Sequence, residues 1–167
     1  ELPACAATCG TRGRLDVLGN HALGCTAVRS SRHAWFKRST RRALQALPRS
    51  ALYPREAGCG ADGEPVPADS DGRRPGDVAV RPPDQAQWCY LDHTVWGLRA
   101  ENARQASEDP YHIPRAAFRK KMRDAVTAVV AAAGGRRVPV AASTYGVLDP
   151  RSARALRSLA SDADRSS

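Results

Sequence analysis

Three acidic residues are spaced so that a folded chain could bring their carboxylates together. Asp92 stands inside an apolar and aromatic run, residues 88–96, which predicts a β-strand. A carboxylate buried in a strand is costly unless it is paired or binds a metal. Asp77 opens the preceding strand candidate, residues 78–80, and a hairpin would set both aspartates on neighbouring strands about 5 Å apart. Glu64 lies thirteen residues before Asp77 and is the candidate third acid.

Carboxylates that converge on one sheet edge favour Mg²⁺ or Mn²⁺, which prefer oxygen ligands. Such a metal beside a basic surface predicts phosphodiester cleavage, because it activates water and stabilises the leaving oxygen. Two lysines of a later helix could assist this water. Relative to Phe118, Lys121 falls at about 60°, at the edge of the apolar stripe, and Lys120 at about 160°, on the far face. We expect Lys121 to lean over the sheet; the alternative for either lysine is an ordinary solvated side chain.

Cysteine and histidine cluster near the N-terminus with the spacing Cys5-x3-Cys9-x11-His21-x3-Cys25. Zinc prefers four nitrogen or sulfur ligands in a tetrahedron, often as two close pairs separated by a loop. We therefore predict a structural Zn²⁺ site, because the protein fills all four positions. The alternative is a set of ordinary small residues in a frayed terminus. Cys59 and Cys89 are expected to be small buried hydrophobic residues.

The charge distribution indicates a polyanionic partner. The 167 residues include 26 Lys and Arg against 17 Asp and Glu, a net charge of +9. Residues 17–55 carry eight basic side chains and no acid, and residues 115–137 carry seven against one. Between them, residues 56–84 carry seven acids against three arginines. This layout suits a protein whose acids hold metal ions while its basic flanks hold nucleic acid.

The candidate contacts to DNA phosphate are basic residues of these regions. They are Arg32, Lys37, Arg38, Arg41, Arg42, Arg73, Arg74 and Lys120. For each, the alternative is a solvated surface side chain. His33, at the predicted start of a helix, is either a helix cap or a phosphate contact, and the sequence does not decide between them.

The periodicity predicts a small α/β (α+β) fold with a short mixed sheet flanked by helices. A helix over 32–47 buries Phe36, Thr40, Ala43, Leu44 and Leu47. The hairpin of 78–96 follows, after a possible short strand near Glu64 to Pro67. A short helix over 99–106 and a long helix over 115–133 come next. The long helix carries the stripe Phe118, Met122, Ala125, Val129 and Ala133, and Gly134-Gly135 ends it. The last strand covers 138–144, and residues 151–167 are mostly Ser, Arg, Ala and Asp.

We expect three regions along the chain: a zinc knuckle over 1–30, a core over 31–148, and a tail or frayed helix over 149–167. No stretch is long and apolar enough to predict a transmembrane helix, so we expect no membrane partner. The chain begins with Glu1 and shows no secretory signal. It is therefore expected to be an intracellular piece of a longer protein.

Several short motifs follow one another in an order typical of one nuclease family. They are His21-Ala-Leu-Gly-Cys25, Arg32-His33, Glu56-Ala-Gly58, Glu64-Pro65, Asp71-Gly-Arg-Arg-Pro-Gly-Asp77-Val78, Leu91-Asp92-His-Thr-Val95 and Val138-Pro-Val-Ala-Ala-Ser-Thr-Tyr-Gly146. Together they resemble the restriction-like endonuclease region at the C-terminal end of non-LTR retrotransposon reverse transcriptases. This region belongs to the PD-(D/E)XK nuclease superfamily. The resemblance covers roughly residues 5–148.

The resemblance implies a role for each acid. Asp77 matches the Asp of the Pro-Asp motif, Asp92 matches the first acid of the (D/E)XK motif, and Glu64 matches the upstream acid. Glu56 is the alternative upstream acid, since many members place it at the end of the first helix. The family's Cys-Cys-His-Cys knuckle matches the four predicted zinc ligands.

Two residues depart from the family pattern. Gly76 separates Pro75 from Asp77, and Thr94 stands where the superfamily usually has Lys. In the retrotransposon branch the lysine can come from the following helix, which here carries Lys120 and Lys121. The resemblance thus implies a Mg²⁺-dependent DNA endonuclease. It would act in the nucleus and nick target DNA for a reverse transcriptase region of the same polyprotein.

Two other functions are compatible with the sequence. A catalytically decayed copy would keep the fold and bind nucleic acid, and Thr94 in place of lysine favours this alternative. A zinc-dependent interaction domain without nucleic acid is the second, and the acid-free stretch 17–55 argues against it.

Overall fold

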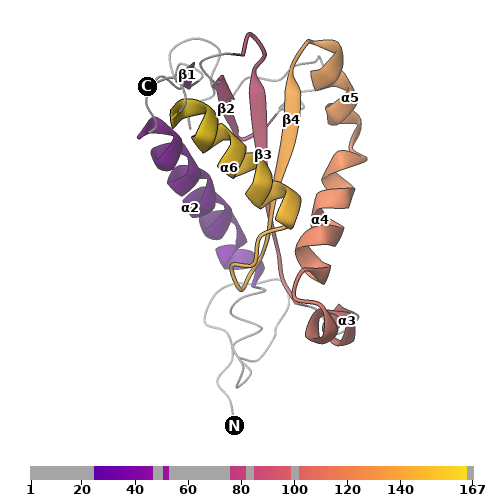
Figure 1. Ribbon diagram of the computed structural model, residues 1–167. Helices are drawn as coiled ribbons and strands as arrows, with labels where there is room; N and C mark the ends of the chain where they lie inside the picture. The colour runs from indigo at the N-terminus through magenta and orange to yellow at the C-terminus, as the bar shows by residue number, and fades with distance from the viewer. Residues whose placement is uncertain (1–24, 47–50, 53–75, 82–84, 99–101, 165–167) are drawn as a thin grey trace.

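The computed structural model describes residues 25–46, 51–52, 76–81, 85–98 and 102–164. Their strands form one four-stranded sheet in the order β1-β2-β3-β4 (Figure 1). The strands are β1 (Ala51–Leu52), β2 (Val78–Arg81), β3 (Cys89–Trp96) and β4 (Arg136–Ser143). The short strand expected near Glu64 lies outside the described residues.

The sheet is mixed, as the sequence predicts. β1 pairs with β2 and β2 with β3 in antiparallel fashion, which confirms the predicted hairpin, whereas β4 runs parallel to β3. A parallel neighbour needs a long crossover, because the chain must return to the same end of the sheet. Three helices supply it: α3 (Ala103–Glu108), α4 (His112–Met122) and α5 (Ala125–Ala132). The fold is therefore mixed α/β, with helices flanking a small sheet.

Helices cover both faces of the sheet. On one face, α2 (Thr26–Gln45) and α6 (Pro150–Asp164) lie side by side (Figure 1). Leu44 of α2 and Leu159 of α6 pack there against strand residues such as Leu91 and Val140. On the other face, Ala117 and Phe118 of α4 pack with Ala141 of β4. Because both faces of β4 are covered, its sequence is a nearly continuous apolar run rather than an alternating one.

The first described helix is confirmed, with a different start. α2 begins at Thr26 rather than Arg32 and ends at Gln45, close to the predicted stop. Thr40 and Leu44 are buried as expected, whereas Ala43 is exposed. The apolar stripe thus predicted the correct face, but its width was overestimated.

The prediction of one helix over 115–133 is wrong. The chain breaks at Arg123 and Asp124, so α4 and α5 are separate helices. Asp124 caps α5, because its side chain accepts a hydrogen bond from the N–H of Val126 at 3.2 Å. As a result Met122 and Ala125 are exposed, and the buried residues of α5 are Val126 and Val130. The predicted stop is confirmed, since Gly134 adopts a positive φ of 73°.

The C-terminal segment, for which a tail or frayed helix was expected, forms the 15-residue helix α6. Leu156 and Leu159 join the hydrophobic core with strand residues. Asp149 is fully buried just before the helix and accepts a hydrogen bond from the N–H of Arg151 at 2.8 Å. The packing and this cap explain why a Ser- and Arg-rich segment is helical here. None of the helices in the described part of the chain has the length and apolarity needed to span a membrane.

Candidate functional site

Asp77 and Asp92 lie opposite each other where β2 begins. Val78 pairs with Leu91, so continuing this antiparallel register by one residue places Asp77 across from Asp92. The N–H of Asp77 donates a hydrogen bond to the carbonyl of Leu91 at 2.8 Å. The predicted juxtaposition of these two residues is therefore present in the backbone.

The structure explains why position 76, which interrupts the Pro-Asp motif, is occupied by glycine. A Cβ at this position would lie 2.9 Å from the carbonyl oxygen of Leu91 and 3.1 Å from Cβ of Tyr90. Glycine thus allows the chain to approach β3 closely enough for Asp77 to reach its position opposite Asp92.

The carboxylate of Asp77 is held by two histidines. Its Oδ2 accepts a hydrogen bond from the backbone N–H of His93 at 2.6 Å, and His33 Nε2 lies 3.2 Å away. His33 Nε2 is also 3.1 Å from the carbonyl oxygen of His93. Because both of these partners are acceptors, Nε2 carries the proton and donates. His33 lies inside α2, which begins at Thr26, so it is not a helix cap, and its side chain orients Asp77.

These contacts shift the pKa values of both partners. Burial by itself raises the pKa of Asp77, but the hydrogen bonds from His33 and His93 outweigh burial and hold this pKa well below its usual range. The hydrogen bond to Asp77 raises the pKa of His33 against the opposing effect of partial burial. Among the described residues, the hydrogen bonds that the Asp77 carboxylate accepts all go to its Oδ2.

The carboxylate of Asp92 lies between two cations. Its side chain is only 8% exposed, and Oδ1 accepts a hydrogen bond from Nζ of Lys121 at 2.9 Å. Oδ2 accepts one from the guanidinium of Arg137, whose side chain is 3% exposed. Asp92 is therefore paired, as a carboxylate inside an apolar strand must be.

Arg137 is itself fixed by neighbouring groups. Its Nη1 donates to Oγ1 of Thr127 at 3.2 Å and to the carbonyl of Lys121 at 3.3 Å, and its Nη2 lies 3.4 Å from Asp124. Its Nε is buried and has no hydrogen-bond partner among the described residues. The guanidinium thus joins β3, β4 and the break between α4 and α5.

His93 occupies the other face of the sheet, as the strand alternation predicts. Its Nε2 is 3.0 Å from Oγ1 of Thr40, and its ring packs edge-on against Phe36 at 4.9 Å between centroids. The side chain is buried, so it supports α2 rather than the opposite face.

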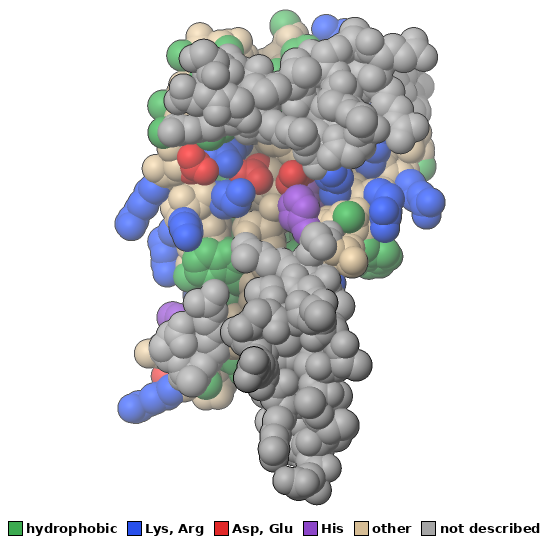
Figure 2. All heavy atoms as spheres, turned by 180° about the vertical axis from the view of Figure 1, so that it is seen from behind, with side chains coloured by type: hydrophobic (Ala, Val, Ile, Leu, Met, Phe, Trp, Pro, Cys, Tyr) green, Lys and Arg blue, Asp and Glu red, His purple; other side chains and the backbone are tan. Residues whose placement is uncertain are grey.

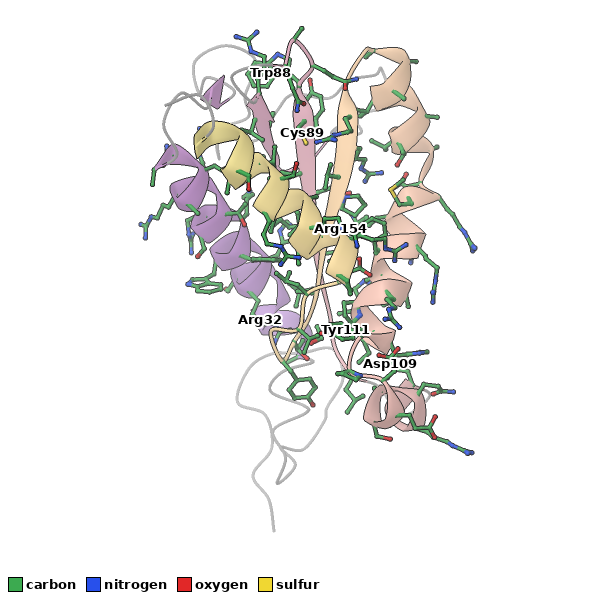
Figure 3. The ribbon with its side chains drawn as sticks, viewed as in Figure 1. Arg32, Trp88, Cys89, Asp109, Tyr111 and Arg154 are labelled. Carbon is green, nitrogen blue, oxygen red and sulfur yellow. The ribbon has the colours of Figure 1, made fainter. Side chains whose placement is uncertain are left out.

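A cavity of about 880 Å³ opens beside these residues. It lies between the first turns of α2, the end of β3 and the last turns of α4. Its lining residues are Arg32, His33, His93, Thr94, Val95, Trp96, Ala117, Lys120, Lys121, Arg123 and Asp124. Figure 2 shows acidic and histidine side chains surrounded by Lys and Arg on one face of the molecule. Arg32 is labelled toward the lower end of α2 in Figure 3.

The two candidate lysines differ in what they contact. Lys121 reaches Asp92, whereas Nζ of Lys120 lies 5.5 Å from the centre of the Trp96 ring. The prediction that Lys120 points away from the sheet is wrong, because its long side chain folds back over Trp96 at the end of β3. Both lysines line the cavity.

The remaining predicted residues lie elsewhere. Lys37, Arg38, Arg41 and Arg42 are on α2 and do not line the cavity. Cys25 is buried directly before α2 and Cys89 is buried in β3, neither in a disulfide. The other predictions lie outside the described residues: Cys5, Cys9, His21, Glu56, Cys59, Glu64, Arg73 and Arg74.

Arg137 and Asp124 were missed by sequence reasoning. An Arg directly before the apolar run 138–142 carried a weak signal, because that position is expected to enter the sheet. Which acid it meets depends on the register of β3 and β4 and could not be read from the sequence.

The described residues supply only part of the set of oxygen ligands that a hard divalent cation needs. In the part of the chain that the structure describes, there is no group of three or more His, Cys, Asp or Glu side chains that could hold a metal ion. Asp77 and Asp92 supply two carboxylates from neighbouring backbones, and Glu64 is the predicted third. No protein-family model and no curated protein matches this chain.

Proposed function

We propose that this protein is a Mg²⁺- or Mn²⁺-dependent DNA endonuclease of the restriction-like PD-(D/E)XK type. The observation that carries the proposal is the contact of Lys121 with Asp92, across from Asp77, at the wall of a basic cavity. A lysine from the helix that follows the acidic strand is the arrangement that the resemblance to retrotransposon nucleases implies. Its presence offsets the replacement of the motif lysine by Thr94.

Each residue has a role in this proposal. Asp77 and Asp92, with Glu64 as third acid, would hold the divalent cation, which when bound polarises the phosphate and lowers the pKa of water. His33 and the N–H of His93 keep Asp77 ionised and oriented. Lys121 lies where it can hold a phosphate oxygen or take part in moving a proton.

The basic lining of the cavity would hold the DNA backbone. Arg32, Lys120 and Arg123 line the same cavity as Lys121, the partner of Asp92, and can neutralise phosphates there. In the wider proposal the domain nicks target DNA for a reverse transcriptase region of the same polyprotein, in the nucleus. The predicted Zn²⁺ knuckle of Cys5, Cys9, His21 and Cys25 would be structural, and buried Cys25 would join it to α2.

The test is plasmid nicking with Mg²⁺ or Mn²⁺, run beside a DNA-binding assay. Asp77→Asn and Asp92→Asn should abolish nicking while binding survives, because each change removes a metal-binding carboxylate. Lys121→Met should slow nicking by about 100-fold or more. The matched control is Lys120→Met, the adjacent lysine of the same helix and cavity. It should weaken binding but leave the nicking rate at saturating DNA nearly unchanged. Equal loss of nicking in both lysine variants would contradict the role given to Lys121.

A nucleic-acid-binding domain without nuclease activity is the second candidate. It is favoured by the position of Arg137, because the guanidinium and Lys121 together engage both oxygens of Asp92 and neutralise its charge. A wild-type domain that binds DNA and nicks it with neither metal would establish this candidate and overturn the first.

A further inference from the structure

The outward face of α2 carries an exposed tryptophan, Trp35. Trp35 is 65% exposed, the largest exposure among the exposed large hydrophobic residues of the described chain. Arg38 and Arg42, also exposed, follow it at i+3 and i+7. These spacings align the three side chains on one stripe of the helix, facing away from buried Thr40 and Leu44. We call them the α2 stripe.

The charge around the α2 stripe selects an anionic partner. Helix α2 contains six basic residues, among them Arg38 and Arg42, and no acid. A concentration of charge of one sign on one helix attracts polyanions and raises their local concentration. An anionic membrane is a poor match, since one indole without further apolar neighbours on the stripe offers little area to insert.

The exposed indole of Trp35 further limits the class of anionic partner that would fit the α2 stripe. Tryptophan is highly buried on average, and an indole this exposed beside two arginines of the same stripe suits a ligand with both a flat apolar face and negative charge. Nucleic-acid bases and phosphates together provide it. In a duplex the base faces are already stacked, whereas each unpaired base offers a free face to an aromatic ring. The chemistry therefore favours single strands over duplex.

We propose that the α2 stripe binds single-stranded DNA, with Trp35 stacked on an unpaired base and Arg38 and Arg42 contacting phosphates. This deepens the proposed function and rests on it for the choice of DNA, because a nicked duplex can release one strand near the break. The stripe does not line the cavity, so it would hold the freed strand outside this cavity.

The experiment measures fluorescence anisotropy of labelled oligo(dT) and of a blunt duplex, without added Mg²⁺ or Mn²⁺ and without a chelator that would remove Zn²⁺. Trp35→Ala should weaken oligo(dT) binding by about tenfold, since one stacked base contributes about 1–3 kcal/mol, and should change duplex binding less than about twofold. Trp35→Phe should retain most of the affinity. Arg38→Gln with Arg42→Gln should weaken both ligands and flatten the salt dependence.

Tyr111→Ala is the matched control, because Tyr111 is 40% exposed and also lies beside an arginine, at 5.4 Å from the Arg115 guanidinium. Asp109 lies near Tyr111, whereas the helix that carries Trp35 contains no acid (Figure 3). It should leave oligo(dT) binding unchanged. Circular dichroism checks that each variant folds.

Three results would overturn the proposal: Trp35→Ala binding oligo(dT) as wild type does, equal losses for oligo(dT) and duplex, or tighter binding of oligo(U) than of oligo(dT). Nicking is assayed separately with metal. A domain that never nicks but loses oligo(dT) binding in Trp35→Ala would contradict the nuclease and support the stripe.

Discussion

At the scale of single residues, the pairing of Asp92 with Arg137 holds the centre of the sheet. Both side chains are almost fully buried, and Arg137 also bonds Thr127 and the carbonyl of Lys121. Breaking a buried ion pair from one side leaves an uncompensated charge, which costs more than the pair itself contributes. This pair is therefore a sensitive point of the fold as well as part of the candidate site.

We predict that Arg137→Met lowers the free energy of unfolding by about 3 to 5 kcal/mol, because Asp92 keeps its buried charge with only Lys121 as partner. Adding Asp92→Asn in the same chain should recover at least half of this loss. Urea denaturation of both single variants and the double variant gives the coupling energy. The control is Arg104→Met, whose partner Glu108 is on the surface, and it should change little. Additive losses in the double variant would show that the two side chains do not interact.

At the scale of elements, the break between α4 and α5 positions Lys121. The last turn of α4 carries Lys121, and Asp124 begins α5 directly after it. Oγ1 of Thr127 donates to the carbonyl of Lys121 at 3.2 Å, so α5 also fixes the end of α4. Burial by itself raises the pKa of Asp124, but the hydrogen bond from Val126 and the charge of Arg137 outweigh it and lower this pKa.

Asp124→Ala should therefore cost about 1 kcal/mol of stability at neutral pH, the usual value of an N-cap. Because the pKa of Asp124 is lower in the folded state, this contribution is present above the unfolded pKa of about 3.9 and is lost as the pH falls through the folded value. The difference from wild type should be constant from pH 7 to about pH 5 and shrink at lower pH.

Thermal unfolding across this pH range measures the effect. Asp124→Asn is the control, since an amide caps a helix at any pH. A wild-type advantage over Asp124→Ala that grows below pH 4 would contradict the assignment of Asp124 as an ionised cap.

At the scale of the whole molecule, helices from both ends of the described chain close one face of the sheet. Leu44 of α2 and Leu159 of α6 belong to the same cluster of buried residues. The face that carries the carboxylate of Asp92 is covered by α4 and α5, whereas the carboxylate of Asp77 is held by His33 of α2. The C-terminal helix is thus part of the core, far in sequence from the acids whose strand it covers.

Leu159→Ala should lower the free energy of unfolding by about 2 to 5 kcal/mol, because it opens a cavity against the strands. Arg157→Ala, an exposed change on the same helix, should stay within about 0.5 kcal/mol of wild type. Chemical denaturation followed by circular dichroism compares them. Equal stability of the two variants would mean that α6 does not contribute to the core.

Local pattern was enough to predict β2, β3 and their hairpin from the sequence, but not the two-residue strand β1. Apolar and aromatic residues around a turn predicted antiparallel strands at 78–80 and 88–96, and the two-residue period predicted that His93 and Asp92 face opposite sides. Gly134 marked the end of the crossover helices, because only a residue at ease with positive φ can stop a helix in this way. These features depend on residues that are neighbours in the chain.

Only the tertiary structure decided which side chains meet at the candidate site. Asp77 reaches His33, 44 residues away, and Asp92 reaches Lys121 and Arg137, 29 and 45 residues away. Each contact depends on the parallel register of β3 and β4 or on how α2 and α4 pack against the sheet, and a shift of one residue would replace every partner. The acids could be nominated from the sequence because they are costly inside a strand. The partners of these acids could not be predicted from the sequence. Many arginines and lysines of this basic chain are equivalent candidates until the fold brings one of them within hydrogen-bond distance of an acid.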